Sequence, residues 1–145
     1  MKTKCNTLFF ILIGIFLFPD NTYCQNTDNQ KKTMEQKLAV VWTSGDRDVA
    51  LKMVFMYTYN AKKNAWWDEV NLIIWGPSSK LLSEDEELQS YIGKMQKEGI
   101  SIFACKACAD MYDVSPKLKE LGINVKFMGE PLTEYLQKDY KVITF

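Results

Sequence analysis

Apolar residues along the chain follow two different spacings, one typical of buried strands and one typical of helices. Short runs rich in β-branched and other apolar residues indicate strands that are buried on both faces of a parallel sheet. Between these runs, apolar residues recur every three or four positions, which indicates helices with one buried side. The predicted strands cover residues 38–43, 69–75, 100–104, 123–128 and 141–145. The predicted helices cover residues 47–63, 83–99, 115–122 and 131–138.

Two of the predicted helices have patterns that define their buried side or their first turn. In the first helix, Met53 and Met56 belong to the stripe that we expect to face the sheet. In the second, Ser83 and Glu86 have the spacing of a capping box, in which two side chains satisfy free backbone N–H groups. Gly99 marks the end of this helix, because glycine readily adopts the left-handed conformation that often follows a helix.

The order of these elements, strand and helix in alternation with short connections, predicts an α/β domain. Strands joined through helices pair in parallel, and the crossovers place the helices over the faces of the sheet. We therefore predict a three-layer α/β/α sandwich with a five-stranded parallel sheet. The spacing of apolar residues does not define the order of the strands within that sheet.

The first residues of the chain have the pattern of an export signal. Lys2 and Lys4 precede the apolar run 8–18, and polar residues follow it. A basic start, a short apolar stretch and a polar end define a secretory signal peptide. The run is shorter than the roughly 20 residues that span a bilayer core. We therefore expect a cleaved signal peptide over residues 1–24, a periplasmic or secreted protein, and no stable membrane insertion after cleavage.

The expected cleavage site lies after Cys24 and leaves Gln25 as the first residue of the mature chain. The alternative is a lipid anchor on Cys24, which is less favoured because the bulky Tyr23 precedes the cysteine. Residues 25–36 are polar and without a pattern, so we interpret them as a flexible tether. Residues 37–145 form the single predicted domain.

Functional residues are expected at one edge of the predicted sheet, because open α/β proteins bind and react where their parallel strands end. Four loops reach this edge. They contain Thr43, Ser44, Gly45 and Asp46 after the first strand, residues 75–80 with Gly76 and Pro77 after the second, residues 105–108 after the third and residues 128–131 after the fourth. The glycines either allow a ligand to approach the backbone closely or serve only the geometry of the turns.

The segment Cys105-Lys106-Ala107-Cys108 carries the strongest chemical signal in the chain. It places two thiols directly after the third predicted strand. Backbone N–H groups of the following turn, together with the Lys106 ammonium, favour the thiolate of Cys105, which is the reactive form. Cys108 lies one helical turn later and can reach back to Cys105. The alternative is a pair of small buried apolar residues, a role that free cysteines often have.

Two thiol chemistries fit this segment. One is dithiol–disulfide exchange, for which a CxxC pair beside a βαβ unit is the usual signature. The other is sulfur carriage, in which a thiolate accepts a sulfane sulfur as a persulfide and passes it on. A zinc site is disfavoured, because the mature chain has no histidine and no further cysteine to complete the ligand set.

Composition excludes several other classes of function. The 145 residues include 18 basic and 18 acidic side chains and no histidine. Zero net charge gives no electrostatic basis for binding nucleic acid, and the lack of histidine excludes Ser-His-Asp and Cys-His mechanisms. No glycine-rich nucleotide-binding spacing occurs, so we expect no cofactor. Arg47 could clamp an anion, but we interpret it as paired with the flanking Asp46 and Asp48.

Three stretches of the chain resemble the DsrE/DsrF-like proteins, relatives of the sulfur-relay subunits of tRNA thiolation and dissimilatory sulfur oxidation. They are KLAVVWTSGD, IIWGPSSKLLSEDEEL and IFACKACADMYDVSPKLKELGI. The resemblance covers nearly all of residues 38–145. It implies a three-layer α/β domain with strand order 4-3-2-1-5, assembly as a homotrimer or hexamer, and a sulfur-carrying cysteine directly after the third strand.

By this resemblance, Cys105 occupies the position of the sulfur-carrying cysteine, and Cys108 that of a second cysteine found in some members. Asp113 stands where the family usually has a glycine. The leader departs from the cytoplasmic relay subunits, so the chain resembles an exported branch that contains the CxxC pair.

We therefore expect an exported sulfur carrier or transfer protein that holds sulfane sulfur on Cys105, with Cys108 as the second thiol. A dithiol–disulfide redox protein that uses the same pair is one alternative. A non-catalytic oligomeric module that binds a small ligand is another. The sequence leaves open whether the protein is an enzyme, and which sulfur donor and acceptor it serves.

Overall fold

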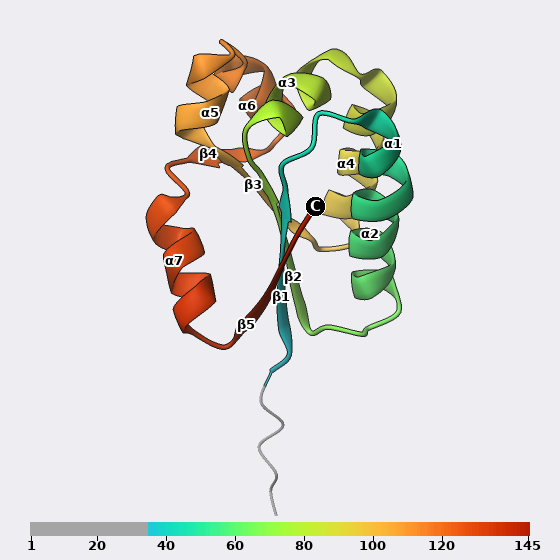
Figure 1. The fold of residues 1–145 in the computed structure, drawn as a ribbon. Helices are drawn as coiled ribbons and strands as arrows, with labels where there is room; N and C mark the ends of the chain where they lie inside the picture. Colours follow the sequence, from blue (N-terminus) through green and yellow to red (C-terminus); the bar gives the residue numbers. More distant parts are fainter. Residues whose placement is uncertain (1–34) are drawn as a thin grey trace, which may run out of the picture. The chain divides into compact units, whose positions relative to one another are not determined.

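The structure is a computed structural model that describes residues 35–145, and these residues form a three-layer α/β domain on one parallel sheet (Figure 1). Its strands lie in the order β4-β3-β2-β1-β5. They are β1 (Lys37–Trp42), β2 (Glu69–Ile74), β3 (Ser101–Cys105), β4 (Asn124–Lys126) and β5 (Tyr140–Thr144). The predicted five-stranded parallel sheet is confirmed, and so is the strand order that the family resemblance implies.

The strand β1 lies in the interior of the sheet between β2 and β5. It pairs with β2 in the register Lys37↔Glu69 and with β5 in the register Lys37↔Tyr140. Every residue of β1 after Lys37 is buried, and the same is true of β2 after Glu69. Burial on both faces explains why these strands appear in the sequence as continuous apolar runs.

The helices α1, α2 and α4 lie on one face of the sheet and α7 lies on the other (Figure 1). The strands end toward the part of the domain that contains α3, α5 and α6 (Figure 1). The helical segments are α1 (Arg47–Val49), the π-helical η1 (Ala50–Phe55), α2 (Met56–Lys63), α3 (Pro77–Glu84), α4 (Glu86–Lys97), α5 (Lys106–Met111), α6 (Ser115–Glu120) and α7 (Gly129–Gln137).

The first helical region differs from the prediction in the side that it buries. Its middle segment η1 is π-helical, so each backbone hydrogen bond spans one residue more than in an α-helix. Val54 and Phe55 are buried, whereas Met53 and Met56 are 50% and 51% exposed. The predicted inward orientation of both methionines is therefore wrong, because a wider turn rotates residues away from the α-helical stripe.

A second difference lies between β2 and α4, where the helix α3 replaces a predicted loop. It begins at Pro77, directly after Gly76, and a proline is tolerated in the first turn because the N–H group that proline lacks would have no partner within the helix there. The predicted capping box is wrong. Asp85 caps α4 by accepting a hydrogen bond of 3.0 Å from the N–H of Leu88, while Ser83 donates to a carbonyl within α3.

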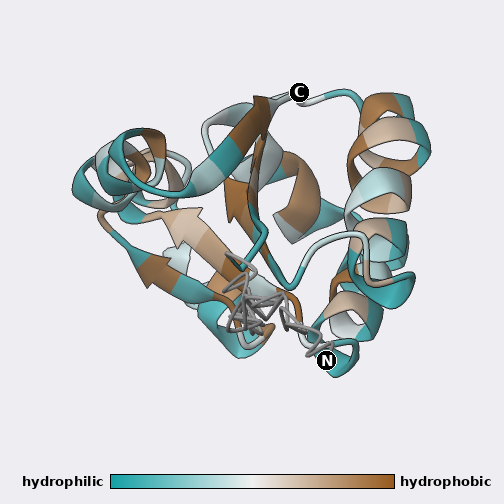
Figure 2. Ribbon diagram, turned by 90° about the horizontal axis from the view of Figure 1, so that it is seen from below, coloured by the Kyte–Doolittle hydropathy of each residue, from teal (hydrophilic) through white to brown (hydrophobic). Residues whose placement is uncertain are grey.

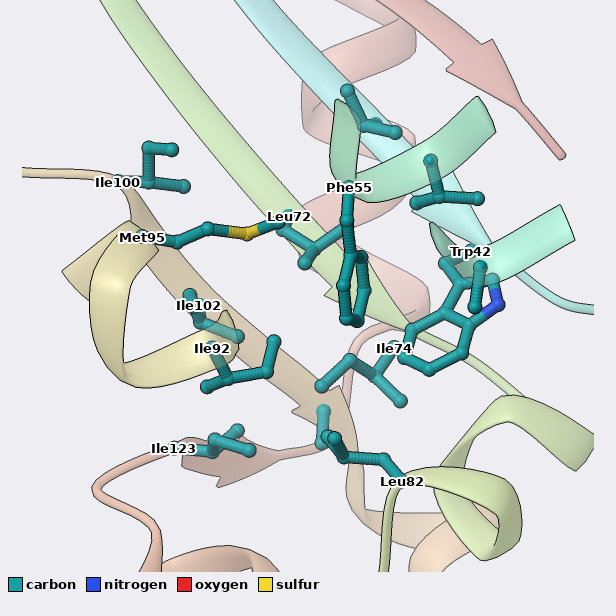
Figure 3. Packing of buried hydrophobic residues seen from close by; sticks show 14 of the residues in the cluster. Trp42, Phe55, Leu72, Ile74, Leu82, Ile92, Met95, Ile100, Ile102 and Ile123 are labelled. Carbon is teal, nitrogen blue, oxygen red and sulfur yellow. The ribbon is translucent and has the colours of Figure 1, made fainter. Parts of the chain in front are cut away.

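The two faces of the sheet have hydrophobic clusters of different size. The larger cluster lies under α1, α2 and α4, where Figure 3 shows the ring of Phe55 between Leu72 and Trp42. The rings of Phe55 and Trp42 meet edge to face with centroids 5.0 Å apart. Figure 2 shows hydrophobic residues gathered mainly on the strands. The smaller cluster lies under α7, and its buried members are Ala39, Val41, Ile73, Cys105 and Met128.

The predicted signal peptide, residues 1–24, lies outside the described residues, and so do residues 25–34 of the predicted tether. Within residues 35–145, no helix has the length and apolar character needed to cross a membrane.

Candidate functional site

The two thiols lie where β3 passes into α5, at the edge where the parallel strands end. Cys105 is the last residue of β3 and immediately precedes the first turn of α5, and its side chain is 4% exposed. Cys108 lies within α5 and is partly buried. Both cysteines are free, and both belong to the hydrophobic cluster on the α7 side of the sheet that also contains Met128 and Trp75. The short CxxC segment thus turns from strand to helix with both sulfurs on one face.

The environment of Cys108 distinguishes the two thiols. Burial raises the pKa of the Cys108 thiol, and the hydrogen bond with Cys105 raises this pKa further. The backbone N–H of Gly76 donates to the Cys108 sulfur and opposes both effects. The electrostatic interaction with Cys105 also raises the pKa of Cys108.

The turn between β2 and α3 contributes directly to the thiol site through Gly76. This residue has φ 72° and ψ −133°, a region that only glycine enters without strain. In this conformation its N–H reaches the sulfur of Cys108. An added Cβ would meet no heavy atom within 4 Å. The backbone angle, and not a lack of space, therefore requires glycine at this position.

Ser78, a residue that the sequence analysis did not single out, holds this turn in place. Its side chain is fully buried. The hydroxyl donates to the carbonyl of Trp42 at 2.6 Å and accepts from the N–H of Trp75 at 3.0 Å. Ser78 thereby ties the ends of β1 and β2 together. A serine after a glycine and a proline is common in ordinary turns, so the sequence offers little signal for this role.

The loop after β1 supports the site through its backbone. Asp46 caps α1 by accepting from two N–H groups of the first turn. Ser44 accepts a hydrogen bond of 3.0 Å from the N–H of Asp46 and so shapes the approach to that helix. Gly45 comes so close to Pro77 that an added Cβ would lie 3.3 Å from the proline Cβ. Gly45 thereby packs the loop after β1 against the first residue of α3, while Ser44 and Asp46 shape their own loop.

Lys106 has a different partner from the one that the sequence analysis expects. Its ammonium forms an ion pair with Asp110 one turn later and lies 5.4 Å from the centre of the Phe127 ring. Asp110 also accepts a hydrogen bond of 2.6 Å from Ser115, which joins α5 to α6. Asp113, in the turn between these helices, has φ 56°, the left-handed conformation that a family glycine would adopt.

Arg47 forms an ion pair, as the sequence analysis expects, but the predicted partners are wrong. Its guanidinium binds Asp85 at 2.7 Å and also pairs with Glu87. Both acids lie at the beginning of α4 and not beside Arg47 in sequence. Asp46 caps its own helix instead, and Asp48 pairs with a lysine of the next turn. Arg47 therefore connects the first helix to α4.

The structure brings Gly76 to the thiols but places Thr43 toward β5. The Thr43 hydroxyl donates to the carbonyl of Phe145 at 2.7 Å. In the part of the chain that the structure describes, no cluster of three or more His, Cys, Asp or Glu side chains could hold a metal ion.

This fold and site define a class of small α/β domains that present a pair of thiols where a central strand of a parallel sheet ends. Within that class, the chain belongs to the DsrE/DsrF-like family, which it matches over residues 31–145. No curated protein matches the chain.

Two solved structures are similar to this chain. One is a conserved protein of unknown function, BT1422, from Bacteroides thetaiotaomicron, with 39% sequence identity and a TM-score of 0.73. The match covers 76% of this chain and 95% of that one. The other is the ychN protein from E. coli, with 16% identity and a TM-score of 0.61, covering 76% of this chain and 99% of that one. At this lower identity the likeness concerns the fold alone.

Proposed function

We propose that this protein is a DsrE-type sulfur carrier that accepts sulfane sulfur on Cys105 as a persulfide. The observation that carries the proposal is the position of Cys105 at the end of β3, in the same hydrophobic cluster as a second free thiol. Membership of the DsrE/DsrF-like family supports a role in sulfur relay. Parallel α/β domains react at this edge, which supports placing the chemistry there.

The transfer step needs no external oxidant or reductant. The Cys105 thiolate attacks the outer sulfur of a donor R–S–SH. The bond between the two donor sulfurs breaks, the outer sulfur moves to Cys105 with its proton, and the donor leaves as R–S⁻. The product is Cys105–S–SH, and an acceptor thiolate removes the sulfur by the same exchange.

Cys108 suits the role of second thiol rather than first nucleophile. Burial raises its pKa, so at neutral pH it is a proton donor beside the sulfur held on Cys105. Once deprotonated, Cys108 can attack the inner sulfur of the persulfide. This step forms a Cys105–Cys108 disulfide and releases HS⁻, so sulfur leaves the carrier without an external acceptor.

The proposal includes export and self-association. The signal-peptide pattern of residues 1–24 supports a periplasmic or secreted carrier. The family resemblance supports a homotrimer or hexamer. Large apolar side chains exposed on and after α2, such as Met56 at 51% and Trp66 at 57%, add support because exposed apolar surface often marks a contact. Light scattering of the mature protein at micromolar concentration tests the assembly, and a monomer contradicts it.

The test of the carrier function compares two matched variants, Cys105→Ser and Cys108→Ser. Each protein is reduced, treated with inorganic polysulfide and weighed intact by mass spectrometry. We expect the wild type to gain one sulfur that dithiothreitol removes. Cys105→Ser gains none, whereas Cys108→Ser gains one and keeps it longer because it lacks the second thiol. Uptake by Cys105→Ser, or no uptake by the wild type, contradicts the proposal.

A dithiol–disulfide redox function is the second candidate, and it is favoured by two free thiols three residues apart in one hydrophobic cluster. Its test is the reduction potential of the Cys105–Cys108 pair against glutathione buffers. A reversible couple near the roughly −270 mV of thioredoxin, together with no stable added sulfur, supports the redox function over the carrier function.

A further inference from the structure

An apolar pocket opens on the α7 side of the sheet, next to the thiol site. Its volume is about 260 Å³. Val41 and Val142 line it from β1 and β5, and Leu132 and Leu136 line it from α7. Trp75, the first residue after β2, lines it as well. The volume lies slightly below the range of sites for drug-sized ligands, so it suits a single ring or a short aliphatic chain.

The pocket and the thiols share side chains. Trp75 and Leu132 line the pocket, and both also belong to the hydrophobic cluster that contains Cys105 and Cys108. A group bound in the pocket would therefore lie against residues that pack with the thiol pair. This continuity relates the pocket to the chemistry at the end of β3.

The residues that line the pocket carry no charge. The two polar residues among them are Thr43 and Thr144. The Thr43 hydroxyl already donates to the carbonyl of Phe145 at 2.7 Å, so it has no free proton to offer a ligand. Such a lining favours an apolar group and disfavours a charged one, because no side chain of opposite charge in the lining compensates for the water that a charged group would lose.

We propose that this pocket binds the organic part of the sulfur donor, and that the donor is a small hydropersulfide R–S–SH whose R group is apolar and uncharged. The inference rests on the proposed function, because it assumes that Cys105 accepts sulfane sulfur. With R in the pocket, the S–SH group extends past Trp75 toward Cys105. The S–S bond of the donor breaks, the outer sulfur moves with its proton to Cys105, and R–S⁻ leaves and takes a proton from water.

The first test measures binding without sulfur transfer. The probe is benzyl methyl sulfide, a thioether that cannot donate sulfane sulfur. Binding is followed by the NMR signal of the Trp75 indole N–H, assigned with Trp75→Phe. We expect Leu136→Glu to weaken binding at least about tenfold, because it brings a carboxylate to an uncharged pocket.

The matched control is Ile143→Glu, which brings the same charge to β5. Ile143 lies between Val142 and Thr144, so its side chain points to the opposite face of the strand. The exposed fractions, 65% for Leu136 and 37% for Ile143, allow both variants to fold. We expect Ile143→Glu to bind the probe as the wild type does. No shift of the Trp75 signal, or equal binding by the two variants, overturns the inference.

The second test separates the donor from the carrier function. Benzyl hydropersulfide, its 4-carboxybenzyl analogue and inorganic polysulfide are compared as donors to Cys105. We expect the benzyl donor to react at least about tenfold faster than the carboxylated one. Leu136→Glu should remove this advantage, whereas Ile143→Glu, whose side chain lies outside the pocket lining, should keep both the advantage and the wild-type rate with inorganic polysulfide. Equal rates for the two benzyl donors overturn the proposed donor but leave the carrier function intact. No uptake from any donor overturns the carrier function, and the proposed donor falls with it.

Discussion

The two faces of the sheet differ in how completely helices cover them. On one face, α1, η1, α2 and α4 bury large side chains such as Trp42, Phe55 and Met95 without exposure to solvent. On the other face, α7 has no buried residue of its own, and its Leu136 is 65% exposed. The first face is a close-packed core. The second leaves space beside the sheet.

This difference indicates that the two faces of the sheet have different roles. Most of the buried apolar surface, and with it most of the hydrophobic stabilisation, belongs to the closely covered face. The thiols and the apolar pocket belong to the sparsely covered one. A reactive group needs access for its substrate, which a close-packed core does not provide. Substitutions on the two faces should therefore separate stability from sulfur chemistry.

The largest expected effect on stability comes from a substitution on the closely covered face. Phe55→Ala removes a fully buried ring from between Leu72 and Trp42, and we expect it to lower the free energy of unfolding by about 3–5 kcal/mol. Urea denaturation measures the loss. Ile74→Val, at about 1 kcal/mol, serves as a milder variant if Phe55→Ala does not fold. Sulfur uptake per folded molecule should stay at the wild-type level, and a selective loss of uptake contradicts the division between the faces.

The next effect concerns Gly76, where the β2–α3 turn meets the thiols. Gly76→Ala places a side chain at φ 72° and should cost about 1–3 kcal/mol. Displacing the N–H from the Cys108 sulfur should also raise the pKa of that thiol. The pH dependence of Cys108 alkylation, measured in a Cys105→Ser background, reports this shift.

The control for Gly76→Ala is Gly93→Ala in the middle of α4. An added Cβ at Gly93 meets no heavy atom within 4 Å, and the residue does not have a positive φ. We expect a gain in stability of about 0.5–1 kcal/mol, as alanine usually gives in a helix, with no change at Cys108. An equal alkylation shift in the two variants would show that Gly76 has no specific role.

A smaller effect is expected at Glu69, which anchors the sparsely covered face. Burial by itself raises the pKa of Glu69, but hydrogen bonds from Tyr140 and Asn71 and the charge of Lys37 together lower the pKa below its ordinary value of 4.5. A lowered carboxylate pKa stabilises the fold above about pH 4.5, and this stability is lost as the pH falls through the folded-state pKa.

Glu69→Gln should therefore lower stability at pH 7 by about 1 kcal/mol or less and flatten its decline below pH 4.5. Urea denaturation at several pH values measures both changes. Glu134→Gln is the control, since its ion pair with Lys138 is exposed on α7 and contributes little. An unchanged acid dependence in Glu69→Gln contradicts the assigned role.

The smallest effect on stability is expected at Leu136, on the outer part of the pocket. Because its side chain is 65% exposed, Leu136→Ala should change the free energy of unfolding by no more than about 0.5 kcal/mol. The same substitution should still weaken binding of benzyl methyl sulfide. A loss above about 1 kcal/mol would mean that α7 packs as tightly as the helices on the other face.

The strands and the fold class could be predicted from the sequence because they depend on local composition. Runs such as residues 38–43 are apolar at nearly every position, and only a strand buried on both faces suits them. The position of Cys105 at the end of β3 follows from the same reasoning. The order of the strands depends on crossovers between distant segments, so it came from the family resemblance and not from periodicity.

The remaining features depend on contacts that sequence spacing does not encode. The π-helical segment shifts the buried side from Met53 to Val54 and Phe55, and no residue in it signals the wider turn. The partners of Arg47 lie on α4 and not in its own helix. The interaction of the Gly76 N–H with Cys108 joins the turn before α3 to the helix α5, which only the folded sheet brings together.

The place of β1 between β2 and β5 also sets the order in which the domain can be completed during synthesis. The hydrogen bond from Thr43 to Phe145 spans 102 residues, so one side of β1 has no partner until the last strand has emerged. Closing so long a loop is entropically costly, and contacts of this range are typical of slow folding. The strand β3, which positions the thiols, can form before β5 is synthesised. The pocket cannot, because β5 supplies part of its lining. The nascent chain therefore acquires its cysteine pair before it acquires the pocket beside it.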